Sequence, residues 1–393
     1  MPPKKQVEEK RILLGRPGNN LKTGIVGLAN VGKSSLFNAL TKAYLSAAEN
    51  FPFCTINPEE SKVIVPSPRF DNLCELYKPK SEVPAFLTIT DIAGLVRGAA
   101  SGEGLGNEFL SHIRAVDALF QVVRCFDDAD IIHIEGDVNP ARDLEIVAGE
   151  LRLKDIEFAE RHLEGVHKIT RRGGQSLEVK QKKEEAALVE KIIELLKDGK
   201  RIYNQNWSPK EIEIINTMLL LTAKPSIYLV NLSERDYIRK KNKHLIKIKE
   251  WVDINSPGDL IIPFSVALEE RLAPLTGDEL KAEEEKIGAT TAFPKMITHM
   301  RKKMDLISFF TSGADEVREW TIREGTKAPA AAGVIHNDLQ KTFILAEIMK
   351  YSDIEEYKDE KAVKAAGKLH TKGKEYVMED GDIVYFRAAA GKS

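Results

Sequence analysis

In the first part of the chain, apolar and polar positions form a repeating pattern. Between residues 22 and 126, β-branched apolar runs alternate with stretches whose apolar residues recur at helical spacing. Continuous apolar runs at 23–29, 85–95 and 117–126 predict buried strands, and the spacing in 33–45 predicts a helix. Alternation of strand and helix predicts an α/β fold, with a mostly parallel sheet and crossover helices.

The alternation of predicted strands and helices stops at about residue 140. Amphipathic periodicity over 143–163 and again over 177–197 predicts two long helices. A Gly-Gly turn within 170–176 joins them, which predicts an inserted antiparallel helical hairpin.

The α/β texture then returns with a strand at 224–234, a basic helix over 235–252 and a strand at 259–268. In the basic helix, Arg239, Lys243 and Lys247 are expected to share one face. After about residue 304, short apolar runs, one central helix and an acidic turn before the last strand predict a small α+β domain.

We therefore expect a discontinuous first domain, an insertion within it, a second domain and two tails. Their expected bounds are 1–20 for the first tail, 21–139 and 223–303 for the first domain, 140–222 for the insertion, 304–387 for the second domain and 388–393 for the last tail.

Composition narrows the class of protein. The 393 residues contain 58 Lys and Arg against 60 Asp and Glu, a net charge of −2, which excludes a globally basic coat for nucleic acid but not a local basic patch. Three cysteines suggest no disulfide framework. No apolar run is long enough to cross a membrane, and the N-terminus lacks the apolar core of a signal peptide. We expect a cytoplasmic protein without a membrane partner.

One motif carries phosphate chemistry. Residues 27–34 read GLANVGKS, a full match to G-x-x-x-x-G-K-[ST], and they lie between a predicted strand and a predicted helix. Backbone N–H groups of such a loop surround phosphates, Lys33 supplies a cation to the β- and γ-phosphates, and the Ser34 hydroxyl reaches Mg²⁺. The sequence therefore predicts a nucleoside triphosphate site.

Two further segments complete this site. Asp91 and Gly94, in Asp-Ile-Ala-Gly at the end of a predicted strand, are expected to hold the metal through water and to contact the γ-phosphate. Thr55, in the loop before the next strand, is a candidate second metal ligand. A solvated loop threonine is the alternative interpretation of Thr55.

The motif expected to contact the nucleotide base differs from the one that GTPases carry. GTPases have Asn-Lys-x-Asp after this strand, and its Asp accepts hydrogen bonds from guanine. Here the residues are Asn231, Leu232, Ser233 and Glu234, so Leu232 replaces the Lys and Glu234 the Asp. The longer Glu side chain is misplaced for the two-bond contact with guanine, and this favours ATP.

The sequence resembles the Obg-like ATPases, the YchF subfamily of Obg-related P-loop proteins, over nearly its whole length. The resemblance rests on NVGKSS, FPFCTINPEES, DIAGLVRGAASGEGLGN, VVRCFDD, KPSIYLVNLSE, YIRKKNK and WTIREGTKAPAAAGVIHNDLQKTFILAE. It implies a P-loop G domain with the helical insertion, a C-terminal TGS domain of β-grasp-like α+β fold, and Mg²⁺-dependent hydrolysis of ATP in preference to GTP. It also implies phosphate contacts from Asn30, Val31, Gly32, Lys33, Ser34 and Ser35, metal contacts from Ser34 and Thr55, and a base contact from Leu232.

The group that orients the attacking water is less evident. Many small GTPases have a Gln after the D-x-x-G glycine, but this chain has Leu95, which neither donates nor accepts. Several relatives carry a catalytic His in the strand where this chain has Gln121. Gln121 is therefore a candidate water-orienting residue, with a core-edge amide as the alternative. Asn30 occupies the position at which potassium-activated relatives bind a monovalent cation, so K⁺ is a candidate cofactor.

The leading interpretation is an ATPase that acts as a switch in translation, as a monomer associated with the ribosome or another RNA–protein assembly. Lys33, Asp91, Gly94 and Gln121 are its candidate catalytic residues. Asn231, Leu232 and Glu234 join the P-loop residues as the nucleotide-binding set. A GTPase switch and a nucleotide-gated scaffold with incidental hydrolysis stay open as alternatives.

Overall fold

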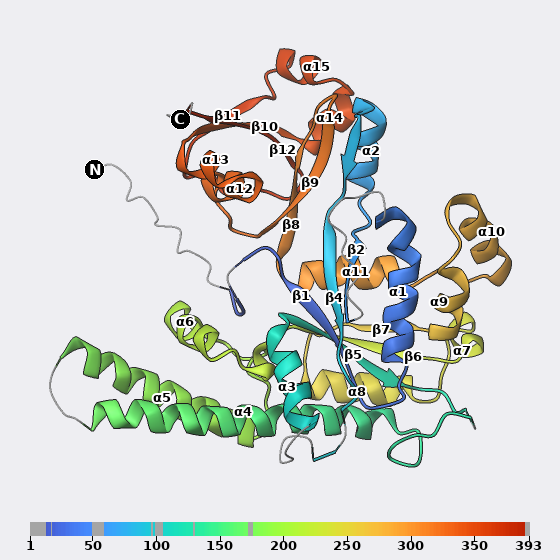
Figure 1. Cartoon of the computed structure of the whole chain (residues 1–393), viewed down its shortest axis with the longest axis vertical. Helices are drawn as coiled ribbons and strands as arrows, with labels where there is room; N and C mark the ends of the chain where they lie inside the picture. Colours follow the sequence, from blue (N-terminus) through green and yellow to red (C-terminus); the bar gives the residue numbers. More distant parts are fainter. Residues whose placement is uncertain are drawn as a thin grey trace.

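The structure is a computed structural model that describes residues 13–16, 18–48, 59–95, 97–98, 105–128, 130–171 and 176–389. Within these residues the chain forms two six-stranded sheets, with a long helical arm beside the first (Figure 1). None of the helices in these ranges is long and apolar enough to span a bilayer.

The first sheet is the expected α/β sheet. Its strand order is β2-β4-β1-β5-β6-β7, and every neighbouring pair is parallel except β2 with β4. The prediction of a mostly parallel sheet is confirmed, and the antiparallel edge strand makes the sheet mixed. Its strands are β1 (Lys22–Val26), β2 (Glu60–Ile64), β4 (Phe86–Asp91), β5 (Ala118–Arg124), β6 (Ser226–Asn231) and β7 (Ile261–Phe264).

Helices cover both faces of this sheet, which is why its central strands are apolar throughout. In β6, Ile227 and Leu229 join the core that contains α1 and α11, whereas Tyr228 and Val230 join the one that contains α8. Alternating side chains thus divide the hydrophobic residues between two layers. The helices of this lobe are α1 (Lys33–Ala48), α3 (Leu105–Ala115), α7 (Glu234–Ile238), α8 (Leu245–Asn255), α9 (Val266–Leu272), α10 (Gly277–Ile287) and α11 (Phe293–Lys303).

The long helices α4 (Pro140–Thr170) and α5 (Leu177–Lys197) lie side by side as the expected hairpin (Figure 1). The first turns of α4 pack on the sheet, and Ala159, farther along, packs with α5 and α6 (Pro209–Met218). Asp155 fixes the point where the arm leaves the sheet, because its carboxylate accepts hydrogen bonds from both N–H groups and the hydroxyl at Leu221–Thr222, in the 3-10 turn η1 (Leu221–Ala223). Burial raises the pKa of Asp155 to about 6.

Two predictions after the arm are wrong in detail. The basic helix expected over 235–252 is interrupted: α7 ends at Ile238, α8 begins at Leu245, and Lys240 between them has a φ of 53°. A left-handed residue cannot continue an α-helix, so Arg239, Lys243 and Lys247 form no continuous stripe. The strand expected over 259–268 ends at Phe264, and the helix α9 begins two residues later.

The second sheet has the order β11-β10-β12-β8-β9-β3. Within residues 306–389, all of them described, four helices accompany it rather than the single central helix expected, and Ala328, Ala331 and Ala332 of α12 pack with Phe309 in its core. The elements are β8 (Leu306–Thr311), β9 (Glu316–Arg323), α12 (Ala328–Ile335), α13 (Asn337–Lys341), β10 (Phe343–Lys350), α14 (Tyr351–Tyr357), α15 (Glu360–Ala365), β11 (His370–Lys372) and β12 (Asp382–Ala388).

Two elements from the first third of the chain belong to the second lobe in space. Strand β3 (Ser81–Val83) pairs in parallel with β9, and α2 (Pro68–Tyr77) places Phe70 and Leu73 against Phe310 and Val317. The segment between β2 and β4, two strands of the first sheet, therefore packs in the second lobe and connects the two lobes.

Leu73 tests this shared packing. Leu73→Ala should lower the free energy of unfolding by about 2–5 kcal/mol, because the side chain is fully buried and its removal leaves a cavity. Denaturant unfolding followed by circular dichroism measures the change. Glu75→Ala, on the exposed side of the same helix, is the control and should stay within about 0.5 kcal/mol. An equal effect of the two substitutions would contradict the packing described.

Candidate functional site

The phosphate loop joins β1 to α1 by a backbone path that few residues can follow. Gly27 and Gly32 have φ values of 154° and 99°, and Asn30 has 62°. A Cβ on Gly27 would lie 2.4 Å from the carbonyl oxygen of Val122. Glycine is therefore required here both for its φ and for the close approach of β5. The path leads into the N-terminus of α1, where free N–H groups and the helix dipole favour an anion.

Lys33 is a buried cation at the start of α1. Its side chain is 6% exposed, and its Nζ donates to the carbonyl oxygen of Leu28, 2.7 Å away, inside the same loop. Burial lowers the pKa of Lys33 to about 8, although the negative charge of Asp91 acts in the opposite direction. Ser34, next to it, is exposed, and Ser35 is half-buried.

The Asp91–Gly94 segment lies directly against the phosphate loop. Leu95 donates its N–H to Gly27 at 3.0 Å and accepts from the Ala29 N–H at 3.3 Å. A Cβ on Gly94 would lie 2.9 Å from the Cα of Ala29. Asp91 Oδ1 is buried and has no hydrogen-bond partner among the described residues. A buried, unpaired carboxylate oxygen therefore belongs to a side chain close enough to Lys33 to act on its charge.

Leu95 contributes packing as well as these backbone contacts. Its side chain is 1% exposed and belongs to the core of the first lobe. The residue that replaces the usual glutamine is therefore turned inward.

Asn231 connects the phosphate loop to the loop after β7. Its side-chain Nδ2 donates to the Val31 carbonyl at 3.0 Å, and its Oδ1 accepts from the Val266 N–H at 3.1 Å. The side chain is fully buried, and a Cβ on Gly32 would lie only 2.6 Å from its Nδ2. The asparagine thus fixes the position of the phosphate loop from the base side.

The other two base-side residues have different surroundings. Leu232 is 2% exposed and packs with Ile248 and Val252 of α8, so its side chain lies in a core. Glu234 is partly exposed, and its carboxylate forms an ion pair with Arg271 at 2.8 Å. Neither side chain is arranged like the Lys and Asp of a guanine pocket.

Gln121 and Thr55 are the remaining candidates. Gln121 is 4% exposed within the sheet, and its Nε2 donates to Ser226, which also accepts from the buried Arg201. Its surroundings are those of an interior amide, the alternative that the sequence left open. Thr55 lies outside the described residues.

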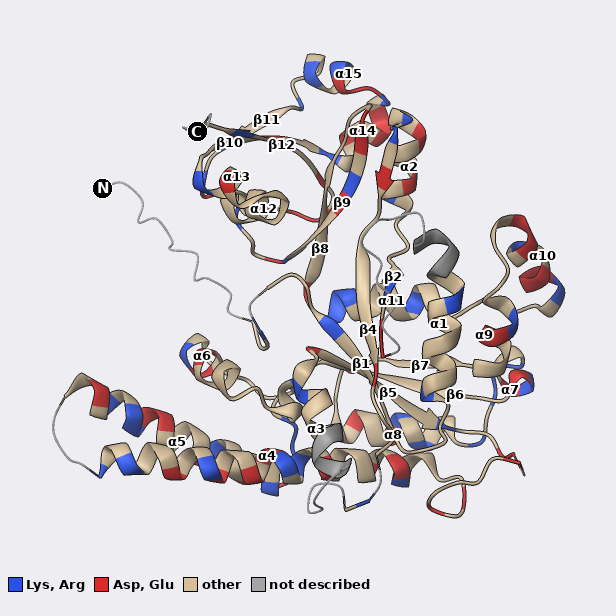
Figure 2. Cartoon of the chain, viewed as in Figure 1, with Lys and Arg blue, Asp and Glu red and all other residues tan. Residues whose placement is uncertain are grey.

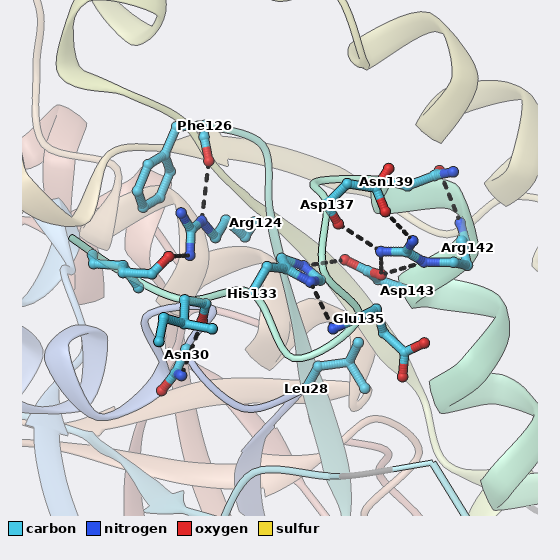
Figure 3. A network of polar contacts seen from close by, with 12 residues as sticks. Leu28, Asn30, Arg124, Phe126, His133, Glu135, Asp137, Asn139, Arg142 and Asp143 are labelled. Carbon is cyan, nitrogen blue, oxygen red and sulfur yellow. Dashed lines mark hydrogen bonds and ion pairs between the residues drawn. The ribbon is translucent and has the colours of Figure 1, made fainter. Parts of the chain in front are cut away.

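Sequence analysis missed the loop that connects β5 to α4. Figure 3 shows that Asn30 of the phosphate loop points to this loop, where its Nδ2 donates to the Ile132 carbonyl at 3.1 Å. Arg124, 1% exposed, donates to the carbonyls of Phe126, Asp128 and Ile131 and so fixes the course of the loop. A charged residue ending an apolar strand was the available signal, because a buried guanidinium requires several acceptors.

Comparisons with known proteins agree over the whole chain. A family model described as "50S ribosome-binding GTPase" matches residues 22–156, and the YchF-GTPase_C model, described as "Protein of unknown function (DUF933)", matches 306–389. The chain is 70% identical to Obg-like ATPase 1 of Saccharomyces cerevisiae, over 100% of both chains, and 60% identical to Obg-like ATPase 1 of Schizosaccharomyces pombe, over 99% of both. A solved structure, "Structure of the Schizosaccharomyces pombe YchF GTPase", matches with a TM-score of 0.90 at 60% identity, covering 96% of this chain and 100% of that one.

Asn231→Asp tests the connection between the phosphate loop and the base side. The change removes the donor to Val31 and turns a carboxylate toward its carbonyl oxygen, so nucleotide affinity should fall about tenfold or more. Isothermal titration calorimetry measures the affinity. Asn255→Asp, which removes a similar amide from a bond to the Trp251 carbonyl on α8, is the control. Wild-type affinity in the Asn231 variant would show that the phosphate loop does not need this bond.

Proposed function

Because the chain belongs to the Obg-like ATPase 1 family, the YchF branch of the P-loop GTPase fold, we propose that it binds and hydrolyses ATP in preference to GTP. The proposal takes Asn30, Val31, Gly32, Lys33, Ser34 and Ser35 as the phosphate-binding set. It takes the protein to be a cytoplasmic, monomeric switch that associates with the ribosome. Ribosome binding is named in the description of one matching family model.

The state of Glu234 carries the preference for ATP. Recognition of guanine needs a carboxylate that is free to accept from two N–H donors of the base, and the Glu234 carboxylate is paired with Arg271. Adenine lacks these donors on its corresponding edge, so it does not need that carboxylate. The buried Leu232 side chain leaves the backbone at this turn as the group that would contact the base.

Phosphate binding would use Lys33 and the backbone N–H groups at the start of α1. Lys33 would exchange its bond to the Leu28 carbonyl for the β- and γ-phosphates, and the N–H groups at the start of α1 would bind phosphate oxygens. P-loop NTPases generally use Mg²⁺, and the oxygen atoms of Ser34 and Asp91 are the hard donors that this ion prefers. The bound ion supplies neutralisation of negative charge on the phosphate oxygens. Thr55 stays a proposed second ligand.

Hydrolysis needs a stabilising group that the usual glutamine does not supply here. Leu95 is in the core, and Gln121 donates to Ser226 inside the sheet. We propose that a K⁺ ion next to Asn30 offsets the negative charge that develops in the transition state. The Asn30 amide nitrogen already faces the Ile132 carbonyl, which leaves its Oδ1 for such an ion.

Competition between ATP and GTP tests the proposed function. Purified protein should bind ATP more tightly and hydrolyse it with the higher kcat/KM, and Lys33→Ala should abolish both activities. Arg271→Gln frees Glu234 and should shift the ATP-to-GTP ratio of kcat/KM several-fold toward GTP. Lys286→Gln, which removes a comparable exposed ion pair with Glu283, is the control. A preference for GTP in the wild type would favour the GTPase alternative, whereas tight binding with negligible turnover would favour a scaffold.

The pKa of Lys33 predicts a pH dependence of nucleotide binding. The pKa is about 8 in the nucleotide-free protein, and the triphosphate raises it by favouring the charged amine. Binding therefore takes up a proton above about pH 8, and the Kd should rise there by up to about tenfold per pH unit. Titrations between about pH 7.5 and 9.5 measure this. A flat profile, or the same slope in Lys33→Met, would exclude Lys33 as its source.

The role of Asn30 predicts a dependence on the monovalent cation. Hydrolysis should be faster in K⁺ than in Na⁺ at equal ionic strength, because Na⁺ is too small for the same oxygen set. Asn30→Gly keeps the positive φ accessible while removing the side chain, and it should make the two rates equal. Steady-state assays of both proteins in the two salts decide the point. Equal wild-type rates would rule out the cation.

A further inference from the structure

The loop between β5 and α4 exposes an unusual cluster of apolar side chains. Ile131, Ile132 and Ile134 are 39%, 80% and 42% exposed. They account for three of the ten large hydrophobic side chains that are exposed among the described residues. Single exposed apolar residues are ordinary, whereas three within four positions make this loop a candidate contact surface. We refer to residues 130–139 as the isoleucine loop.

The loop turns His133 inward and its isoleucines outward. His133, between two exposed isoleucines, is 6% exposed; its Nε2 lies 2.9 Å from Asp143 Oδ2, and its Nδ1 accepts from the Glu135 N–H (Figure 3). Arg124, also buried, donates to the Ile131 carbonyl at 3.0 Å. The exposure of the isoleucines is therefore fixed by buried polar contacts on the other side of the loop rather than by lack of structure.

The same loop contacts both the phosphate loop and the chain that follows Gly94. Asn30 of the phosphate loop donates to the Ile132 carbonyl, and Arg97, three residues after Gly94, forms an ion pair with Glu135 at 2.9 Å. A partner bound to the isoleucines would thus lie one contact away from the phosphate loop and from the Asp91–Gly94 segment.

Charge around the isoleucines indicates the kind of partner. Residues 125–139 contain Asp127, Asp128, Asp130, Glu135 and Asp137 and no Lys or Arg (Figure 2). Asp127, Glu135 and Asp137 have cationic partners, but Asp128 and Asp130 form no ion pair with any described residue and are exposed. Exposed carboxylates without an ion-pair partner repel nucleic-acid phosphates and attract Lys and Arg side chains.

We propose that Ile131, Ile132 and Ile134, with Asp128 and Asp130, form a docking surface for a basic protein face of the ribosome. The proposal rests on the ribosome association proposed above. It places the contact inside residues 22–156, the segment that matches the "50S ribosome-binding GTPase" model. It assigns to this loop a contact with protein rather than with RNA.

Co-sedimentation with ribosomes purified from Saccharomyces cerevisiae, the source of the 70% identical relative, tests this surface. The protein is loaded with a saturating non-hydrolysable ATP analogue. The triple variant Ile131→Ser, Ile132→Ser, Ile134→Ser keeps every backbone carbonyl and should bind ribosomes about tenfold or more weakly. The double variant Ile246→Ser, Ile254→Ser removes isoleucines that are 71% and 78% exposed on α8, and it should bind as the wild type does.

A second variant separates a protein contact from an RNA contact. Asp128→Asn with Asp130→Asn removes two charges while keeping a side-chain oxygen to accept from the residue 130 N–H, as Asp128 Oδ1 does. Against a basic protein face this variant should bind several-fold more weakly and lose salt dependence. Tighter binding would mean that the loop faces phosphates and would overturn the proposal.

The remaining outcomes are also distinguishable. Normal ribosome binding by the triple isoleucine variant overturns the docking surface and leaves the ribosome association intact. Loss of the ATP analogue from that variant, measured by calorimetry, assigns the isoleucines to the nucleotide pocket and overturns the surface as well. Absence of wild-type binding overturns both the association and the surface.

Discussion

The close approach of the phosphate loop to β5 is the constraint on which the rest of the first lobe depends. Gly27 lies so near the Val122 carbonyl that no side chain fits, and three positive φ values then turn the chain into α1. A loop this tight needs its position fixed from outside. Leu95 pairs with it on one side, Asn231 bonds to it on the other, and Asn30 extends the connection to the loop after β5. The buried Lys33 amine lies within this enclosure and donates to the loop's own Leu28 carbonyl.

The residues of the Asn231–Glu234 motif have two different structural roles. Asn231 holds the fold of the site, whereas Glu234 is bound by Arg271 and Leu232 is part of a core. A GTPase scaffold therefore keeps the residue that orders the phosphate loop and changes those that would read guanine. Leu232 and Glu234 can therefore differ from the GTPase residues without changing the bond between Asn231 and the phosphate loop.

The sheet also couples the site to distant parts of the molecule. Helix α4 begins beside the loop after β5, packs on the sheet, and continues into the arm, where Asp155 fixes its exit. Between β2 and β4 of the first sheet, the chain forms α2 and β3, which belong to the second lobe. Helix α2 packs in the core of that lobe, and β3 pairs with β9. Both lobes and the arm are thus attached to strands whose ends carry the candidate nucleotide site.

The sequence by itself determined what short-range pattern encodes. Apolar runs and helical spacing predicted the parallel sheet, the helical hairpin and α1, and the G-x-x-x-x-G-K-S motif predicted the phosphate loop, since spacing along one segment fixes each of these. Only the tertiary structure decided which surroundings each side chain has. It buried Gln121 beside Ser226 and Leu232 beneath α8, ended the basic helix before Lys240, and moved β3 into the second sheet. It also turned His133 inward and its isoleucine neighbours outward. These outcomes depend on contacts between residues far apart in the chain, and local periodicity carries no information about such partners.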